Sequence, residues 1–211
     1  MDNAEYESRI DQLWNEIHEA SAIKDLASRK KAIEAVAGKI EEVIAQRRAA
    51  ATLFLLGYAW YFHPERMTSP VIQEKVEAAL RYAIELTPAY ARAHMYLGHQ
   101  AFDLGRYKEA RSHFENVNVE QLEPYWGMKV HEMRVCCAIA IDGLPQSLNA
   151  LEGYVQMAEQ LPCQDLWPTQ LAKWIKAQAP QLGEFEIRRV RKLAARLGEA
   201  SLLRDLFSSI V

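Results

Sequence analysis

Apolar residues recur every three or four positions along most of this chain, which places them on one face of an α-helix. The pattern is clearest over residues 91–117, where Ala93, Leu97 and Ala101 share one face and Tyr107, Ala110 and Phe114 share the next. Gly105 separates these stretches, and glycine accepts the left-handed backbone that ends a helix at little cost. The sequence therefore predicts a helical hairpin, with two short amphipathic helices joined at residues 104–106.

The chain before this hairpin shows the same periodicity. Residues 4–20 predict one amphipathic helix, with Leu13 and Ile17 on its apolar face, and a polar interval at 21–28 separates it from a second. The second helix carries an apolar stripe formed by Ile33, Val36, Ala37, Ile40, Val43 and Ile44. This pair is either a degenerate copy of the hairpin or an N-terminal cap.

Two further copies flank the central hairpin. At about residues 50–90, Leu56-Gly57 corresponds to Leu97-Gly98, and an insertion at 63–70 lengthens the loop before a helix that starts at Pro70. At 131–164 the first helix is extended back to near Pro124, and its turn lies at Gly143-Leu144-Pro145. Beyond Pro162, amphipathic stretches at 166–177, 184–197 and 199–210 predict a degenerate unit and a capping helix.

The central hairpin resembles a tetratricopeptide repeat, a helix-turn-helix unit of about 34 residues. The match at residues 91–124 is carried by Leu97, Gly98, Gly105, Tyr107, Ala110 and Phe114, although His94 replaces the usual tryptophan. The resemblance implies an all-α fold in which antiparallel helical hairpins stack in a right-handed superhelix, an α-solenoid. We expect one domain over residues 1–211, with an N-terminal pair or cap at 1–48, three units at 50–164 and the degenerate end at 165–211.

The resemblance also implies a protein-binding function. In this family the first helix of each unit lines a concave groove, and we expect the groove here to hold a peptide or partner-protein segment. The residues at the corresponding positions of the first two units are Phe54, Tyr58, Tyr61, Phe62, Arg92, Met95, His99, Phe102 and Asp103. Two other uses stay open: the N-terminal helix fills the groove, or the aromatic residues pack between repeats.

The sequence offers no catalytic, metal or cofactor constellation. It has no His-Glu-x-x-His, no Cys-x-x-Cys, no phosphate-cradling glycine loop and no Gly-x-Ser-x-Gly elbow. His94 and His99 stand about 140° apart on a helical wheel, which is poor geometry for a shared metal ion. We therefore expect a non-enzymatic scaffold or adaptor that needs no cofactor.

Composition narrows the choice of partners. With 50% hydrophobic residues, 25% charged residues and a net charge of −3, the chain has no general attraction for nucleic acid or an anionic membrane. No apolar run reaches the roughly 18–20 residues that span a bilayer. The three cysteines, two of them adjacent, predict no disulfide framework and favour a cytoplasmic setting. We interpret the basic cluster at 188–196 as a solvated helix face.

Two alternatives to a peptide-binding adaptor stay open. The first is a structural subunit that forms a homodimer through apolar residues of the last helix, Leu202, Leu206 and Phe207. The second is a sensor or neutralising protein that takes a small ligand or a toxin-like partner. The pattern of residues does not rank these roles.

Overall fold

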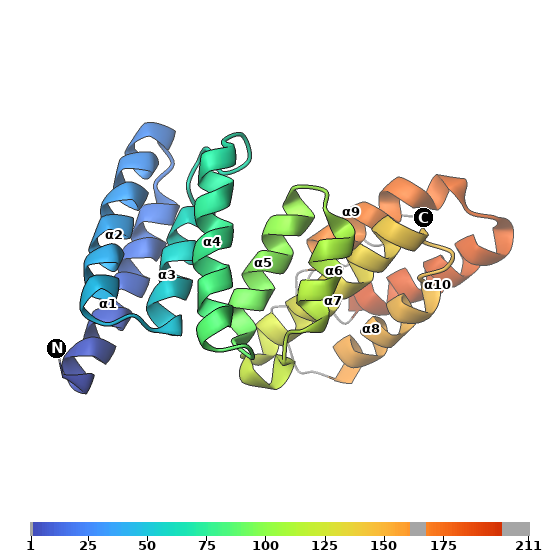
Figure 1. The fold of residues 1–211 in the computed structure, drawn as a ribbon. Helices are drawn as coiled ribbons and strands as arrows, with labels where there is room; N and C mark the ends of the chain where they lie inside the picture. Colours follow the sequence, from blue (N-terminus) through green and yellow to red (C-terminus); the bar gives the residue numbers. More distant parts are fainter. Residues whose placement is uncertain (1, 161–167, 200–211) are drawn as a thin grey trace. The chain divides into compact units, whose positions relative to one another are not determined.

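The fold is entirely helical in the residues that the structure describes. This computed structural model describes residues 2–160 and 168–199, which form ten α-helices and two short 3-10 helices. The chain divides into two compact units, Met1–Gly105 and Arg106–Val211, which are considered separately (Figure 1). The prediction of an all-α protein is confirmed over these ranges.

The first unit contains five helices connected by short turns, except for the longer loop before the fourth. Their bounds are α1 Asn3–Ala22, α2 Leu26–Gln46, α3 Ala50–Tyr61, α4 Pro70–Leu86 and α5 Ala91–Asp103. Each helix packs against the next one in the chain, and the α3–α4 pair has the largest interface. In addition, α1 contacts α3 and α3 contacts α5, so the odd-numbered helices form a row of their own.

Local sequence signals set the helix ends in this unit. Asp2 and Asp25 cap α1 and α2, accepting hydrogen bonds from the backbone N–H groups of Glu5 (2.8 Å) and Ser28 (2.7 Å). Pro70 begins α4 as predicted, and the Ser69 hydroxyl accepts from the N–H of Ile72 at 3.4 Å. Because capping supplies partners for exposed N–H groups at helix starts, these polar residues explain where the helices begin.

Gly57 lets α3 and α4 approach closely. A Cβ built on Gly57 would lie 2.6 Å from Cγ of Leu80 and 3.3 Å from its backbone nitrogen. Leu80 is fully buried, so the space opposite Gly57 is already filled. The glycine of the Leu-Gly pair singled out in the sequence therefore has a packing role at this position.

The second unit contains the remaining described helices. Their bounds are α6 Tyr107–Glu115, η1 Val119–Gln121, α7 Pro124–Asp142, α8 Leu148–Gln160, α9 Thr169–Gln178, η2 Ala179–Gln181 and α10 Glu184–Glu199. The long helix α7 packs against α6, α8 and α9, and α10 packs against α8. The unit is thus organised around α7, whose start at Pro124 agrees with the predicted extension.

Charged side chains of α7 form hydrogen bonds with backbone groups at the ends of the neighbouring helices. Arg134 donates to the carbonyl oxygens of Phe114, in the last turn of α6, and of Val117, just beyond the helix, at distances of 2.8–3.0 Å. Glu132 is fully buried and accepts from the backbone N–H groups of Gln170 (3.0 Å) and Leu171 (3.1 Å) at the start of α9. Lys129 pairs with the same carboxylate, so its charge is not left uncompensated.

The two predicted turn glycines have the expected backbone. Gly105 has φ 75° and Gly143 has φ 87°, both in the region that favours glycine. The helices on either side of Gly105 exist as predicted, but they belong to different units, so the prediction of a packed hairpin stays a prediction. The same holds for the single continuous domain. Leu202, Leu206 and Phe207 lie outside the described residues.

Adding one methyl group at Gly57 should destabilise the protein because the new Cβ would overlap the buried Leu80 side chain. We expect Gly57→Ala to lower the free energy of unfolding by about 1–3 kcal/mol, measured by urea denaturation. Gly38 in α2 is the matched control, since a Cβ there meets nothing within 4 Å. Gly38→Ala should instead stabilise the protein by about 0.5–1 kcal/mol. Equal effects of the two substitutions would contradict this account of Gly57.

Candidate functional site

An aromatic layer connects the odd-numbered helices of the first unit. The Trp14 ring of α1 stacks on Tyr58 of α3, with centroids 4.8 Å apart and planes 12° from parallel. Tyr58 also contacts Tyr96 of α5 in an edge-to-face arrangement, with ring centroids 4.8 Å apart. Phe54 also contacts Trp14, Tyr58 and Tyr96 at centroid distances of 5.6–6.2 Å. These rings tie three helices together.

The predicted groove residues fall into two groups. Those that are buried are Phe54, Tyr58, Met95 and Phe102, which are 2–8% exposed. Those that are half-buried are Tyr61, Phe62, Arg92, His99 and Asp103. The structure thus places all nine on α3, α5 or the turn directly after α3, and only the second group offers surface to another molecule. Their use in partner binding stays a prediction.

Both alternatives for these aromatic residues stay predictions, but two of the rings pack between alternate helices of the first unit. Tyr58 and Phe54 face both Trp14 and Tyr96, so they fill the space between α1, α3 and α5. Helix α1 joins this row beside α3 as the partner of α2. Helix α1 therefore contributes one side of the aromatic layer, through Trp14.

Trp14 and His18 were not among the predicted site residues, yet they extend this layer to the surface. Trp14 is half-buried and His18 is exposed. His18 Nδ1 donates to the Trp14 carbonyl oxygen at 2.8 Å, which leaves Nε2 to accept from the Tyr58 hydroxyl at 3.3 Å. The spacing of Trp14 and His18, one helical turn apart beside the apolar stripe of α1, is the sequence signal that could have identified them.

Asp103, the acidic residue of the predicted site, is already paired. Arg66 donates to its Oδ2 atom at 2.9 Å and to Oε1 of Gln100 at 2.8 Å. The Tyr61 hydroxyl also donates to Asp103, at 2.9 Å, and the Arg66 guanidinium lies 4.0 Å from the centroid of the Tyr61 ring. Burial and the nearby carboxylate raise the pKa of Tyr61, which keeps this donor protonated. The negative charge of Asp103 is thereby neutralised by Arg66 of the 63–70 loop.

The same loop is anchored at its start by a buried histidine. His63 is 3% exposed, its Nδ1 accepts from the backbone N–H of Glu65 at 3.2 Å, and its Nε2 lies 3.7 Å from a carboxylate oxygen of Glu34. Burial lowers the pKa of His63, an effect that outweighs the opposing carboxylates of Glu65 and Glu34. The predicted insertion is therefore held against the helices at both ends, by His63 and by Ser69.

Cysteine, histidine and acidic side chains are the candidates for metal binding and for nucleophilic chemistry. No group of three His, Cys, Asp or Glu side chains there is placed to hold a metal ion. Cys136 and Cys137 are fully buried, and burial raises the pKa of both thiols, that of Cys137 to about 12. A thiol that stays protonated is a poor nucleophile and a poor metal ligand.

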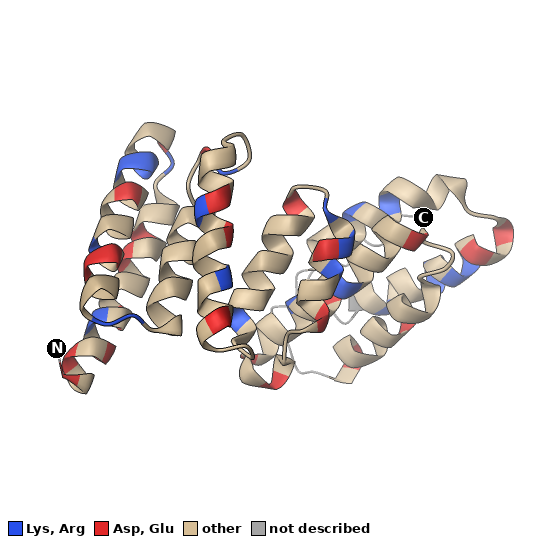
Figure 2. Ribbon diagram, viewed as in Figure 1, with Lys and Arg blue, Asp and Glu red and all other residues tan. Residues whose placement is uncertain are grey.

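The basic residues of α10 pair with acidic residues of α8. Arg189 lies 2.6 Å from Glu152 and Arg196 lies 2.7 Å from Glu159, and all four side chains are partly exposed. Figure 2 colours the basic and acidic positions of the ribbon. The arginines lower the pKa of both glutamates, chiefly through these hydrogen bonds. The cluster at 188–196 therefore does not present an uninterrupted positive face.

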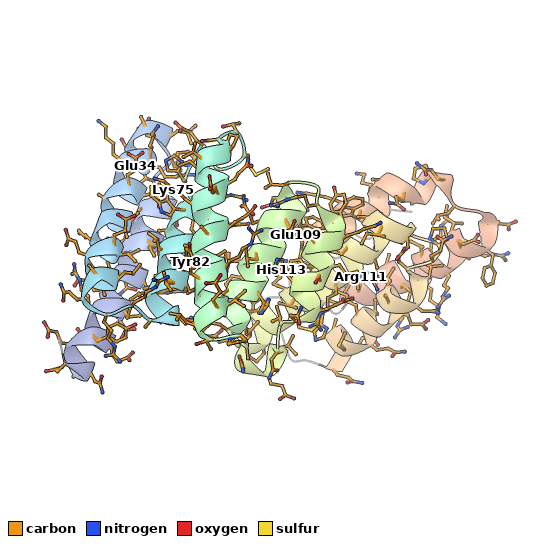
Figure 3. All side chains as sticks on the ribbon, in the orientation of Figure 1. Glu34, Lys75, Tyr82, Glu109, Arg111 and His113 are labelled. Carbon is orange, nitrogen blue, oxygen red and sulfur yellow. The ribbon has the colours of Figure 1, made fainter. Side chains whose placement is uncertain are left out.

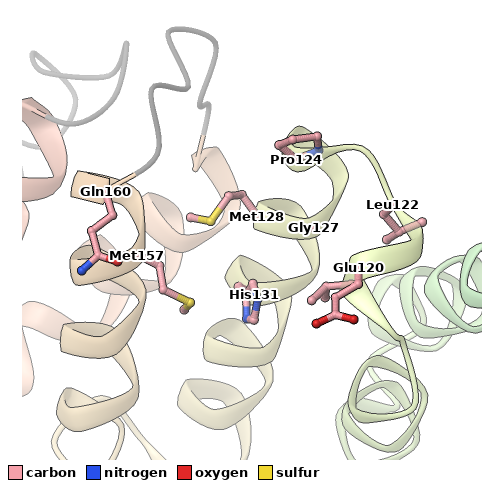
Figure 4. A pocket seen from close by; sticks show the side chains of 9 residues that line it. Glu120, Leu122, Pro124, Gly127, Met128, His131, Met157 and Gln160 are labelled. Atoms are coloured by element: carbon pink, nitrogen blue, oxygen red, sulfur yellow. The ribbon is translucent and has the colours of Figure 1, made fainter.

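The second unit holds a cavity that the sequence did not predict. It has a volume of about 490 Å³ and lies between η1, α7 and α8 (Figure 4). Its walls are mostly apolar, with Met128 and His131 from α7 and Met157 from α8 facing it. Met157 and His131 come from separate helices with no shared periodic pattern, so only the packed structure brings them together.

Comparison of the chain with protein-family models, with characterised proteins and with solved structures gave no match. None of the helices in the described part of the chain combines the length and the apolar character that crossing a membrane requires.

Removing the central ring of the aromatic layer should destabilise the fold. Tyr58 is 3% exposed and contacts rings on two other helices, so we expect Tyr58→Ala to cost about 3 kcal/mol in urea denaturation. Tyr82, 45% exposed on α4 (Figure 3), is the control. Tyr82→Ala should change stability by less than about 0.5 kcal/mol. A silent Tyr58→Ala would show that the layer contributes little to folding.

Two ion pairs that hold the 63–70 loop differ in their exposure, which allows a paired test. The Arg66 and Asp103 side chains are 13% and 27% exposed, so Arg66→Ala should cost about 1–2 kcal/mol of stability. Lys30 and Glu65, 2.7 Å apart, are 38% and 47% exposed, and Lys30→Ala should leave the melting temperature unchanged. Thermal melting of both variants measures the difference, and the reverse order would refute the proposed anchoring by Arg66.

Proposed function

We propose that this protein is a non-enzymatic interaction module that binds a segment of a partner protein on the exposed side of its aromatic layer. We further propose that its helix pairs form a tetratricopeptide-like solenoid. The packing within the first unit supports this architecture, because each helix contacts its chain neighbour while α1, α3 and α5 form a separate row. In a solenoid of hairpins, such a row lines the binding surface.

The observation that carries the functional proposal is the row of partly accessible aromatic and polar side chains over a rigid base. Its members are Trp14, His18, Phe62, Arg92 and His99, which are half-buried or exposed. Beneath them, Tyr58, Phe54 and Tyr96 fix the ring positions by mutual packing. Binding surfaces gain affinity when large aromatic side chains are held in place before the partner arrives, since less conformational entropy is lost.

The chemistry of this row favours an apolar or aromatic-bearing segment over a strongly acidic or basic one. Trp14 and Phe62 offer apolar surface, and Arg92 lies 5.3 Å from the centroid of the Trp14 ring. Asp103 is paired with Arg66, so it adds little free negative charge. A helix or extended peptide that presents apolar side chains suits this combination.

Substituting accessible members of the row should abolish partner capture while the fold survives. We expect the double variant His18→Ala with Phe62→Ala to retain less than about one tenth of the partner that the unchanged protein captures from native lysate. Its melting temperature and helical circular dichroism should stay close to those of the unchanged protein. Capture is quantified by mass spectrometry after affinity purification.

The control for this experiment lies on the outer face of α4. Tyr82 and Leu86 are 45% and 50% exposed, so Tyr82→Ala with Leu86→Ala removes a comparable apolar area elsewhere. This double variant should capture the same partners as the unchanged protein. Identical capture by both double variants, or loss only in the α4 control, would refute the proposed surface.

A further inference from the structure

The cavity of the second unit has the size and walls of a small-molecule site. Its volume of about 490 Å³ falls within the roughly 300–1,000 Å³ typical of such sites. The apolar wall is formed by Val119, Leu122, Pro124, Met128 and Met157. Glu120 and Gln160 are exposed and contribute polar atoms at the rim. Such walls bind molecules with a mainly apolar body.

Two thioethers make the wall suited to an aromatic ring. Met128 and Met157 project into the cavity from different helices, and His131 lies between Met157 and Glu120 (Figure 4). Methionine sulfur is polarisable and makes favourable contacts with aromatic rings, and its flexible side chain adapts to a flat ligand. Aliphatic ligands would gain the apolar contacts without this additional interaction.

His131 supplies a hydrogen-bond donor in this apolar setting. Arg134 Nη1 lies 3.5 Å from His131 Nδ1, and because a guanidinium can only donate, Nδ1 is the acceptor. A neutral His131 ring then carries its proton on Nε2. Burial, followed by the charge of Arg134, lowers the pKa of His131, which keeps the ring neutral at pH 7. The ring can therefore donate Nε2–H to an acceptor oxygen.

We propose that the cavity between η1, α7 and α8 binds a small aromatic molecule that carries a carbonyl or carboxylate oxygen. The ring lies against the thioethers of Met128 and Met157, and the oxygen accepts from His131 Nε2. The positive charge of Arg134 behind the imidazole favours an oxygen with negative charge. A metal ion is a poorer occupant, because the cavity contributes a single histidine and mostly carbon atoms.

Methionine methyl groups report on this cavity directly. The full chain, labelled with carbon-13 at its methionine methyls, is titrated with 2-naphthoate and observed by NMR. We expect saturable shifts of the Met128 and Met157 signals with one dissociation constant, while Met67, which is 48% exposed and outside the cavity, does not shift. Decahydro-2-naphthoate, which has the same carboxylate on a saturated ring system, should bind at least about fivefold more weakly.

Two variants and one control test the residue assignments. His131→Phe removes the donor and should weaken 2-naphthoate binding about tenfold or more, whereas Met157→Trp fills the cavity and should abolish binding. Met67→Leu should bind like the unchanged protein. The Met95 and Met133 methyl signals, from two buried residues outside the cavity, show whether each variant is folded.

Several outcomes would overturn the proposal. These are the absence of any shift in the unchanged protein at millimolar 2-naphthoate, equal shifts of all the methionine methyls, equal binding of the saturated analogue, and undiminished binding by a folded His131→Phe variant. None of them bears on partner binding by the first unit, so the two proposals fail separately.

Discussion

The first unit depends on the contacts that Tyr58 makes with Trp14 of α1 and Tyr96 of α5. These contacts join α1, α3 and α5, which are separated along the chain by α2 and α4. Aromatic pairs contribute about 0.5–1.5 kcal/mol each beyond the area they bury, and Tyr58 belongs to several. The ring layer therefore gives the unit a closely packed base, while Trp14 and Phe62 stay half-buried.

Several of the predicted binding residues belong to this packed aromatic base, so their surfaces are covered by neighbouring side chains. Tyr58 and Phe102 lie on the helices expected to face a partner, but their burial gives them a supporting role. Asp103 is likewise committed to Arg66. What remains at the surface is a smaller set of apolar, imidazole and guanidinium groups. Under the proposed function, that set favours a partner with apolar side chains over one selected by charge.

The second unit uses charge in a different way, to complete helix ends around α7. Glu132 accepts from backbone N–H groups at the start of α9, and Arg134 donates to carbonyl oxygens at and just after the end of α6, so both charged side chains have backbone partners. Buried charges are tolerated when hydrogen bonds of this kind compensate their lost hydration. Arg134 also donates to His131 Nδ1, which leaves the His131 Nε2–H group as a donor for the neighbouring cavity.

The sequence by itself determined the helices, because periodic apolar positions, Asp and Ser caps, Pro70, Pro124 and the two turn glycines act over a few residues. It also marked α3 and α5 as carriers of the candidate face. Only the tertiary structure decided which of those residues are buried, that Arg66 neutralises Asp103, and that Met157 meets His131 in a cavity. Those outcomes depend on contacts between residues far apart in the chain, and no local spacing encodes them.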